Sequence, residues 1–250
     1  WVQLSQTSGT LEQDQRIEVS IDWTRIPVGR QTAVITVSGP EGQSVPVRLH
    51  AIRSDKYTRD TINAFGGLTG PTAIAAESAV KNIAVNGVRW ETIPDYGRGA
   101  SGMAVFPVTA DSVKPPRNSP RLEYPVFIPK AGTVHIDLIT GISLNVQPGR
   151  GVAVAVSIDD GEPLILDAFE GQFYDDPSRR GDKSSPAIRS WGKWVRDNAR
   201  ILTSTHQINE PGVHTLKVWM VDPGVVLEKL IIYKGELPES YFGPPAKASF

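Results

Sequence analysis

The chain has 250 residues, of which 40% are hydrophobic and 21% are charged, so it can bury the core of one large domain or of two modest ones. A formal net charge of -1 and the lack of any apolar run near the roughly 20 residues of a membrane span argue against a nucleic-acid or membrane partner. Cysteine is absent, which excludes disulfides, thiol nucleophiles and cysteine metal sites, while 23 Gly and 20 Pro predict many short elements separated by turns.

Residues 1–55 have the pattern of a small β-domain. Apolar and polar residues alternate along Arg16–Trp23 and again along Ala33–Ser38, and a third run, Val45–Ile52, follows the turn Gly39-Pro40-Glu41-Gly42. Together with the first residues, these runs predict a short immunoglobulin-like β-sandwich over residues 1–55. Because such domains usually have about 100 residues, we expect leading strands before Trp1 and interpret the chain as a piece of a longer polypeptide.

Residues 56–72 show no sustained periodicity and contain Gly-Gly and Gly-Pro, so they are predicted to be a linker. Residues 73–250 then contain short strand-like runs about ten residues apart. These runs are Met103–Val108, Arg121–Ile128, Gly132–Ile139, Val152–Asp159, Glu162–Asp167, His214–Val221 and Leu227–Tyr233. Such spacing predicts a jelly-roll β-sandwich, with a tight hairpin at Asp159-Asp160-Gly161.

One segment of this second domain is predicted to be helical. Trp191, Trp194 and Val195 recur at helical spacing between about Ser190 and Leu202, with basic residues between them. We expect a single amphipathic helix packed on the sandwich. The whole chain is therefore predicted to be all-β with one short helix.

No complete catalytic site is recognisable in the sequence. The segment 97–102 is rich in glycine but lacks the spacing of a dinucleotide-binding motif, and we interpret it as a loop. The carboxylate pairs Asp159-Asp160 and Asp175-Asp176 adjoin along the chain, whereas glycosidase carboxylates must face one sugar from opposite sides. The chain alone is predicted not to be an enzyme.

Aromatic residues near arginines are the candidate binding residues. Flat aromatic faces stack on sugar rings, and neighbouring arginines can bond hydroxyl or carboxylate groups. The candidates for carbohydrate binding are Trp90, Tyr96, Arg98, Trp191, Trp194 and Arg196. Core packing is the alternative for Trp191, Trp194 and Trp219, because the first two lie on the apolar face of the helix and the third lies in a strand.

Several segments resemble a known family in the family's own order. They are residues 71–79, 88–103, 119–124, 156–163, 194–200, 211–230 and 240–245. Together they resemble the C-terminal β-sandwich of glycoside hydrolase family 115, and the start of the chain resembles the immunoglobulin-like module that precedes it. The resemblance implies a non-catalytic C-terminal accessory region of a xylan α-1,2-(4-O-methyl)glucuronidase. It also implies an extracytoplasmic location, periplasmic or secreted, and glucuronoxylan or its oligosaccharides as a partner.

The segment Ile74-Ala75-Ala76-Glu77 also resembles the start of carbohydrate-binding modules of families 6 and 35, whose acidic residues hold a structural calcium ion. Ala75 replaces the first acid here, which leaves Glu77 and Glu228 as the candidate metal ligands. Calcium prefers about six to eight oxygen ligands, so the loss of one carboxylate weakens this prediction.

Two functions remain open from the sequence. The first is a tail module that binds xylan through exposed aromatic and arginine side chains. The second is a module that forms a homodimer or docks against the parent catalytic domain without binding glycan, which the charged segment Asp175–Ser185 suggests. The two differ in whether the isolated chain binds an oligosaccharide.

Overall fold

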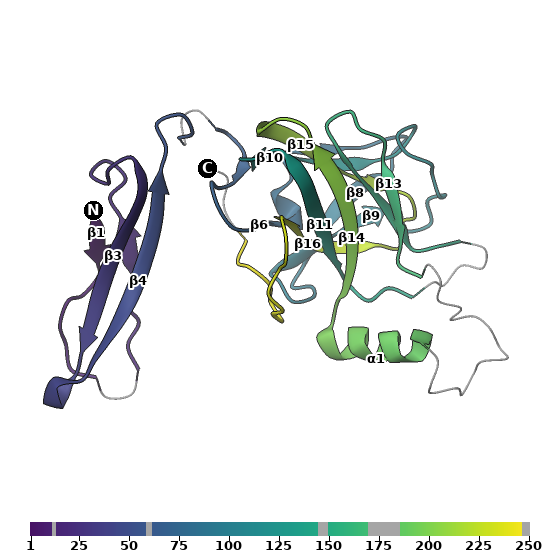
Figure 1. Cartoon of the computed structure of the whole chain (residues 1–250). Coiled ribbons are helices and arrows are strands. Elements are labelled where there is room, and N and C mark those ends of the chain that lie inside the picture. The colour runs from purple at the N-terminus through teal and green to yellow at the C-terminus, as the bar shows by residue number, and fades with distance from the viewer. Residues whose placement is uncertain (12–13, 59–61, 145–149, 170–185, 247–250) are drawn as a thin grey trace. The chain divides into compact units, whose positions relative to one another are not determined.

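The computed structural model of the chain describes residues 1–11, 14–58, 62–144, 150–169 and 186–246, without the side chains of residues 186–191. It divides into two compact units, Trp1–Thr61 and Ile62–Phe250, which are described separately (Figure 1). The division falls inside the stretch 56–72 that the sequence assigns to a linker. The C-terminal part of this stretch is structured, because Phe65–Gly66 forms strand β5 and Phe65 is buried in the core of the second unit.

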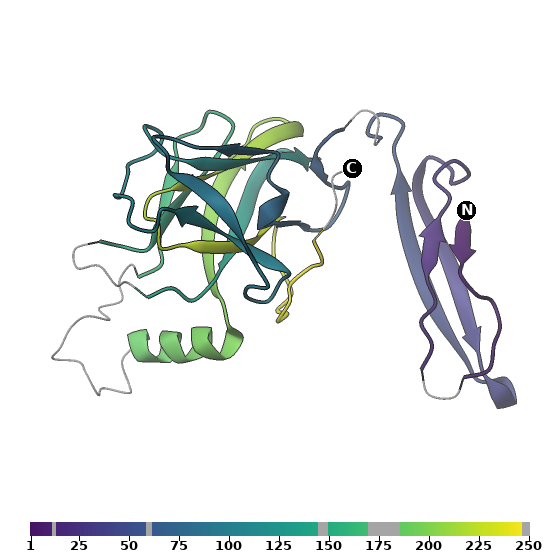
Figure 2. The ribbon, with the colours of Figure 1, turned by 180° about the vertical axis from the view of Figure 1, so that it is seen from behind.

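The first unit contains two antiparallel pairs of strands (Figure 2). They are β1 (Val2–Leu4) with β2 (Val19–Ile21), and β3 (Gly29–Ser38) with β4 (Ser44–Arg53). The short 3-10 helix η1 (Pro40–Gly42) connects the two long strands, at the predicted turn. Among the described residues of this unit, the hydrophobic side chains of Ile26 and Ala51 are buried. The immunoglobulin-like architecture remains a prediction.

The second unit is formed by two mainly antiparallel sheets, each of six strands. One sheet, called sheet C here, has the order β13-β12-β15-β10-β5 with β7 beside β10, and the other, sheet D, has the order β14-β11-β16-β9-β8 with β6 beside β16. Their bounds are β5 Phe65–Gly66, β6 Thr72–Ala75, β7 Lys81–Ile83, β8 Arg89–Pro94, β9 Ser101–Phe106, β10 Arg121–Ile128, β11 Gly132–Thr140, β12 Ala153–Ile158, β13 Leu164–Asp167, β14 Arg200–Ile208, β15 Gly212–Met220 and β16 Val226–Tyr233. The predicted all-β class with one short helix is confirmed.

Successive side chains along each strand point to opposite faces, so that one face lies in the core and the other at the surface. In β15, Leu216, Val218 and Met220 belong to the buried core cluster, whereas Lys217 and Trp219 lie on the other face of the strand. The predicted hairpin at Asp159-Asp160-Gly161 is present between β12 and β13, and Asp159 has φ of 52°. Asp tolerates this left-handed conformation better than most residues, which is why the turn could be identified from the sequence.

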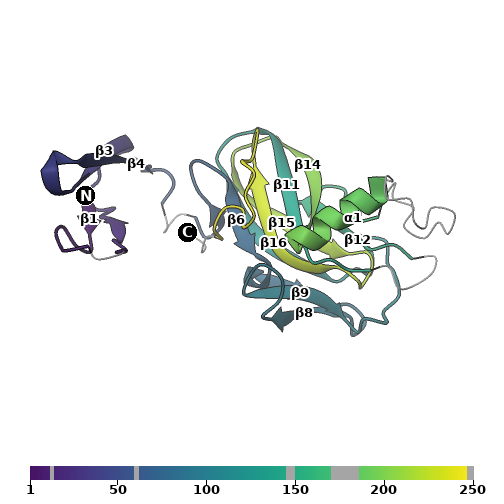
Figure 3. The ribbon, with the colours of Figure 1, turned by 90° about the horizontal axis from the view of Figure 1, so that it is seen from below.

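The helix differs from its predicted extent. α1 spans Pro186–Asp197 and lies across one end of the sandwich (Figure 3). It ends at Asn198, which has φ of 45°, while the amide of Ala199 bonds the carbonyl of Trp194 at 3.2 Å. Residues predicted to continue the helix instead begin β14, because Arg200 and Leu202 alternate inward as a strand requires. No helix in the described ranges is long and apolar enough to cross a membrane.

Trp90 is a core residue rather than a surface aromatic. It is 1% exposed, and its indole N–H points to the carbonyl of Pro120 at 3.4 Å. It lies in β8, where Arg89 and Glu91 on either side are more exposed. Its predicted role in stacking on a sugar is therefore wrong: strand alternation turns this side chain into the space between the sheets.

We expect Trp90→Ala to lower the free energy of unfolding of the second unit by about 3–5 kcal/mol, because it leaves a large cavity in a close-packed core. Urea unfolding followed by circular dichroism measures the change. Phe242→Ala is the matched control, since Phe242 is 66% exposed and its loss should cost about 0.5 kcal/mol or less. Equal losses in the two variants would contradict the core assignment.

Candidate functional site

A groove of about 400 Å³ opens on the outer face of sheet D. Its walls are the loop at Arg98 and Gly99, strands β11, β14 and β16, and the C-terminal segment 235–243. A concavity of this size suits a small ligand or a short stretch of a polymer. Apolar floor residues such as Ile139 and Ile231 alternate with charged ones, so the groove can offer both packing and hydrogen bonds.

A β-bulge places the central residue of this groove. Strand β16 pairs with β11 so that Lys229 faces Ile139 while Leu227 faces Thr140, which leaves Glu228 as the extra residue of β16. Leu227 remains in the core, and Glu228 lines the groove. Bulges change the direction of single side chains in this way, and they are frequent beside functional sites.

The carboxylate of Glu228 is buried and only partly bonded. Glu228 is 5% exposed, and its Oε2 accepts a hydrogen bond from the backbone N–H of Arg98 at 2.9 Å. Its Oε1 has no hydrogen-bond partner among the described residues. Burial raises the pKa of Glu228 above its ordinary value, and the Arg98 amide and the charges of Arg98 and Lys229 offset this only in part.

Two close approaches of the backbone shape the surroundings of this carboxylate. Gly97 has φ of 70°, and a Cβ there would lie 2.2 Å from the carboxyl carbon of Glu228. A Cβ at Gly141 would likewise meet the hydroxyl of Tyr96 at 2.2 Å. Only glycine fits these two positions, which allows the loop before β9 to close over Glu228 and Tyr96 to pack against the end of β11. Burial, followed by the charge of Glu228, raises the pKa of Tyr96.

The two cations of the groove hold the C-terminal segment. The guanidinium of Arg98 donates to the carbonyl of Tyr241 and lies 4.9 Å from the centre of the Tyr241 ring. Lys229 Nζ donates to the carbonyls of Phe242 at 2.9 Å and Pro244 at 3.4 Å. Burial and the neighbouring charge of Arg98 lower the pKa of Lys229. The segment is therefore attached to the sheet through its backbone, while the rings of Tyr241 and Phe242 are at least half exposed.

A second carboxylate lies in the floor of the groove. Asp137 in β11 is 6% exposed, and its Oδ1 accepts hydrogen bonds from Thr203 Oγ1 at 2.7 Å and from the hydroxyl of Tyr233 at 3.3 Å. Burial, together with this carboxylate, raises the pKa of Tyr233. Unlike Glu228, Asp137 is thus supported by side-chain donors on both neighbouring strands.

The structure brings together three of the residues singled out from the sequence and separates the others from them. Arg98 and Glu228 line the groove, and Tyr96 lies near Glu228 without lining it. Trp194 and Arg196 lie on α1 and do not line it, and the side chain of Trp191 lies outside the described residues. Arg196 is exposed and pairs with Asp197 at 3.2 Å. The charged segment Asp175–Ser185 is likewise outside the described residues.

Trp194 has a structural contact that the sequence did not reveal. Its ring lies 4.0 Å from the guanidinium of Arg200, and the ring of Phe169 lies 4.4 Å from the same group. Arg200 is 2% exposed, and burial lowers its pKa to about 10. Two aromatic rings thus pack against a buried cation where α1 meets the sandwich, so Trp194 stabilises the attachment of the helix.

The predicted calcium ligands do not form a complete site. Glu77, in the 3-10 helix η2 (Ala76–Ser78), is exposed, whereas Glu228 is buried. Within the described ranges, no group of three or more His, Asp or Glu side chains is placed to hold a metal ion. Calcium would need backbone or water oxygens for most of its ligands, so the site remains a prediction.

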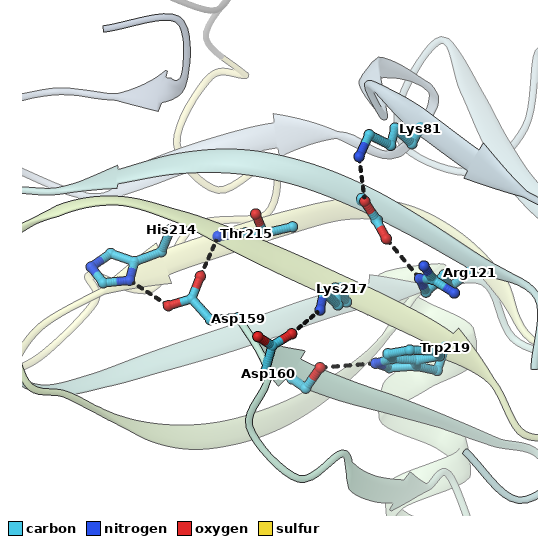
Figure 4. A network of polar contacts seen from close by, with 10 residues as sticks. Lys81, Arg121, Asp159, Asp160, His214, Thr215, Lys217 and Trp219 are labelled. Atoms are coloured by element: carbon cyan, nitrogen blue, oxygen red, sulfur yellow. Dashed lines mark hydrogen bonds and ion pairs between the residues drawn. The ribbon is translucent and has the colours of Figure 1, made fainter. Parts of the chain in front are cut away.

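The outer face of sheet C carries a different set of charges, and these are paired with one another (Figure 4). Glu123 lies between Lys81 at 3.4 Å and Arg121 at 2.7 Å, and Asp160 pairs with Lys217 at 3.2 Å. The same view shows Asp159 bonded to His214 and Thr215, and Trp219 bonded to Ser157. Burial alone would raise the pKa of Glu123, but its bonds to Arg121 and Lys81 lower it overall. This face is closed by internal pairing, whereas the groove retains an unpaired acceptor.

Comparison with known proteins adds one sequence match. Residues 66–246 match the family described as Glycosyl hydrolase family 115 C-terminal domain. No curated protein matches the chain significantly.

The solved structures to which the chain is similar have low sequence identity and TM-scores below 0.5. A family GH115 4-O-methyl-α-glucuronidase with specificity for decorated arabinogalactans is 17% identical with a TM-score of 0.42, and the match covers 64% of this chain and 18% of that one. A family 6 carbohydrate-binding module of a laminarinase from Zobellia galactanivorans is 14% identical with a TM-score of 0.40, over 66% of this chain and 100% of that one. A family 35 module from Clostridium thermocellum is 12% identical with a TM-score of 0.41, over 67% and 100%.

The two buried glutamates should respond in opposite ways to the same substitution. A raised pKa in the folded state means that ionised Glu228 contributes less stability as pH rises through that pKa, so Glu228→Gln should leave the melting temperature at pH 7 unchanged or raise it by about 1–2 °C. The lowered pKa of Glu123 gives stability that is present at neutral pH and lost on acidification. Glu123→Gln should therefore lower the melting temperature at pH 7.

Calorimetric melting between pH 4 and pH 8 measures both variants. The gap between Glu228→Gln and the wild type should widen in favour of the variant as pH rises. A variant at Glu228 that is less stable than the wild type at pH 7, to the same extent as Glu123→Gln, would mean that its carboxylate is a structural ion-pair partner instead.

Proposed function

Because the chain belongs to the glycosyl hydrolase family 115 C-terminal domain family, we propose that it is a non-catalytic accessory module that binds carbohydrate in the groove around Glu228. The observation that carries this proposal is the groove itself. It combines a buried carboxylate that has an unpaired oxygen with the exposed ring of Phe242, against which Tyr241 packs. Sugars present hydroxyl donors at the edges of their rings and apolar C–H faces, and these two kinds of group match them.

The rim supplies surfaces for stacking. Tyr241 is 50% exposed, and its position is fixed by the guanidinium of Arg98. Phe242 packs edge-on against Tyr241, with ring centres 4.9 Å apart. Two adjacent rings held by a cation are a preorganised surface, so little conformational entropy is lost when a sugar packs there.

The described carboxylates support a non-catalytic role. Asp159 and Asp160 adjoin at the β12–β13 turn and are bonded to His214 and Lys217, so they do not face one substrate from opposite sides. Glu228 and Asp137 in the groove are engaged with backbone and side-chain donors of the module. Catalysis is therefore assigned to other domains of a parent glycoside hydrolase.

The parent enzyme is proposed to be a xylan α-1,2-(4-O-methyl)glucuronidase, and the bound glycan glucuronoxylan or its oligosaccharides. Both assignments rest on the family and on the aromatic and charged character of the groove. An extracytoplasmic location follows from the same proposal, because plant cell-wall polymers are outside the cell. A structural calcium ion bound through Glu77 and Glu228 is a separate proposal, tested by melting the protein with calcium and with a chelator.

We expect titration calorimetry of the folded chain with glucuronoxylan oligosaccharides to give saturable heat. Tyr241→Ala removes a stacking ring worth about 0.5–1.5 kcal/mol and should weaken binding roughly threefold to tenfold. Val213→Ala, in β15 of sheet C, is the control and should bind as the wild type does. Absence of heat in the folded wild type would reject the proposed function, and equal weakening by both variants would exclude the groove as the site.

A second candidate function is favoured by the surface of the first unit. Strands β3 and β4 expose several apolar side chains to roughly half of their full area, namely Val34, Val37, Val45 and Val47. A two-stranded sheet is marginally stable in water, so this hairpin is suited to packing against another protein surface. Homodimerisation, or docking against the parent catalytic domain, is the corresponding role.

Sedimentation equilibrium tests the dimer. If the hairpin mediates it, the wild type should show a concentration-dependent increase in mass that Val45→Lys abolishes. Val195→Lys, at a position on α1 that is also more than half exposed, is the control and should leave the equilibrium unchanged. A wild type that stays monomeric at high concentration would reject dimerisation.

A further inference from the structure

Among the described residues, only four buried side-chain atoms lack a hydrogen-bond partner, and one of them lines the groove. The four are Ser101 Oγ, Arg200 Nε, Arg200 Nη2 and Glu228 Oε1. A buried polar atom without a partner costs free energy, and a carboxylate oxygen can be satisfied only by a donor or a cation. Glu228 Oε1 therefore requires a donor. The oxygen is covered in this structure, and Glu228 lines the groove, so a ligand there can supply the donor once the covering loop at Gly97 shifts.

The charges that line the groove also favour an uncharged ligand. Four carboxylates line it (Asp137, Glu228, Glu236 and Glu239) against two cations (Arg98 and Lys229), which gives a local excess of two negative charges. Both cations are already bonded to backbone carbonyls of the C-terminal segment. A ligand that carries a carboxylate would thus meet a negative field and a buried acceptor that it cannot satisfy.

We infer that the groove takes a neutral sugar through a hydroxyl group that donates to Glu228 Oε1, and that Glu228 excludes uronate carboxylates. This inference rests on the proposed function and specifies its ligand: an uncharged, hydroxyl-bearing stretch of a glycan rather than an acidic branch. Glu228 is then a specificity-determining residue. The bulge in β16 and the close approach of Gly97 hold its carboxylate at the edge of the groove, where it discriminates by charge.

Two oligosaccharides that differ only in one carboxylate give a direct test. One is a xylo-oligosaccharide bearing a glucuronate branch, and the other is the same compound after reduction of that carboxyl group to an alcohol. The wild type should bind the reduced, neutral form roughly tenfold more tightly, because the ligand carboxylate would be repelled by the excess negative charge of the groove. Tighter binding of the glucuronate form would overturn the inference.

Glu228→Gln keeps the shape of the side chain and an oxygen acceptor for the Arg98 amide while removing the charge. Binding of the neutral oligosaccharide should weaken roughly tenfold, since a bond to a charged acceptor is replaced by one to a neutral amide, and preference between the two ligands should fall below about threefold. Glu162→Gln, at an exposed position after the β12–β13 turn, is the matched control and should change neither value. An unchanged preference in Glu228→Gln would contradict the role of this residue.

A double variant guards against a folding defect at the buried position. Glu236 and Glu239 are exposed, so changing both to Gln removes two groove charges without disturbing the core, and preference for the neutral ligand should fall in part. An unchanged preference would count against the charge argument. All titrations are repeated with calcium and with a chelator, because a requirement for calcium would show that the free oxygen is a metal ligand. Lack of binding to either oligosaccharide by folded wild type would instead reject the proposed function itself.

Discussion

The buried carboxylate of Glu228 is the constraint on which the arrangement of the groove depends. An ionisable side chain that is 95% buried is unfavourable unless neighbouring groups compensate it. Here the compensation is incomplete: one oxygen bonds a backbone amide, and the other has no partner among the described residues. The bulge in β16, the left-handed Gly97 and the packing of Tyr96 all serve to keep the carboxylate in this position.

The stability needed to retain such a group comes from the rest of the second unit. The core between its two sheets is continuous and contains large side chains such as Trp90, Tyr124 and Leu230. Burial of apolar area at this scale provides far more stabilisation than one poorly compensated carboxylate removes. Arg200 is a parallel case, because its buried cation packs against the rings of Phe169 and Trp194, and no ion pair of Arg200 is present among the described residues. Partially compensated charges of this kind are frequent at functional positions, where structure is selected for more than stability.

The two outer faces of the sandwich differ in how their polar groups are used. On sheet C, Lys81 and Arg121 both pair with Glu123, and Trp219 lies beneath Arg121 with its N–H bonded to Ser157. On sheet D, the cations are bonded to the backbone of the C-terminal segment, which leaves the carboxylates in excess. A ligand on sheet C would have to break existing ion pairs, whereas one in the groove would complete an unfilled hydrogen bond. This difference favours the groove as the binding surface of a module in glycosyl hydrolase family 115.

The sequence by itself determined the β class, the tight turn at Asp159-Asp160-Gly161 and the family, because alternation, turn residues and motif order are local properties of the chain. It also singled out Tyr96 and Arg98 as candidates for carbohydrate binding and Glu228 as a candidate metal ligand, with no indication that they are close together. Only the tertiary structure decided that these three meet, since contacts between residues 130 positions apart depend on how the strands pair. Only the tertiary structure decided which aromatic side chains are exposed. Trp90, beside a turn, is buried because its side chain points between the sheets. Tyr241, near the C-terminus, stays at the surface because Arg98 and Lys229 hold its segment there.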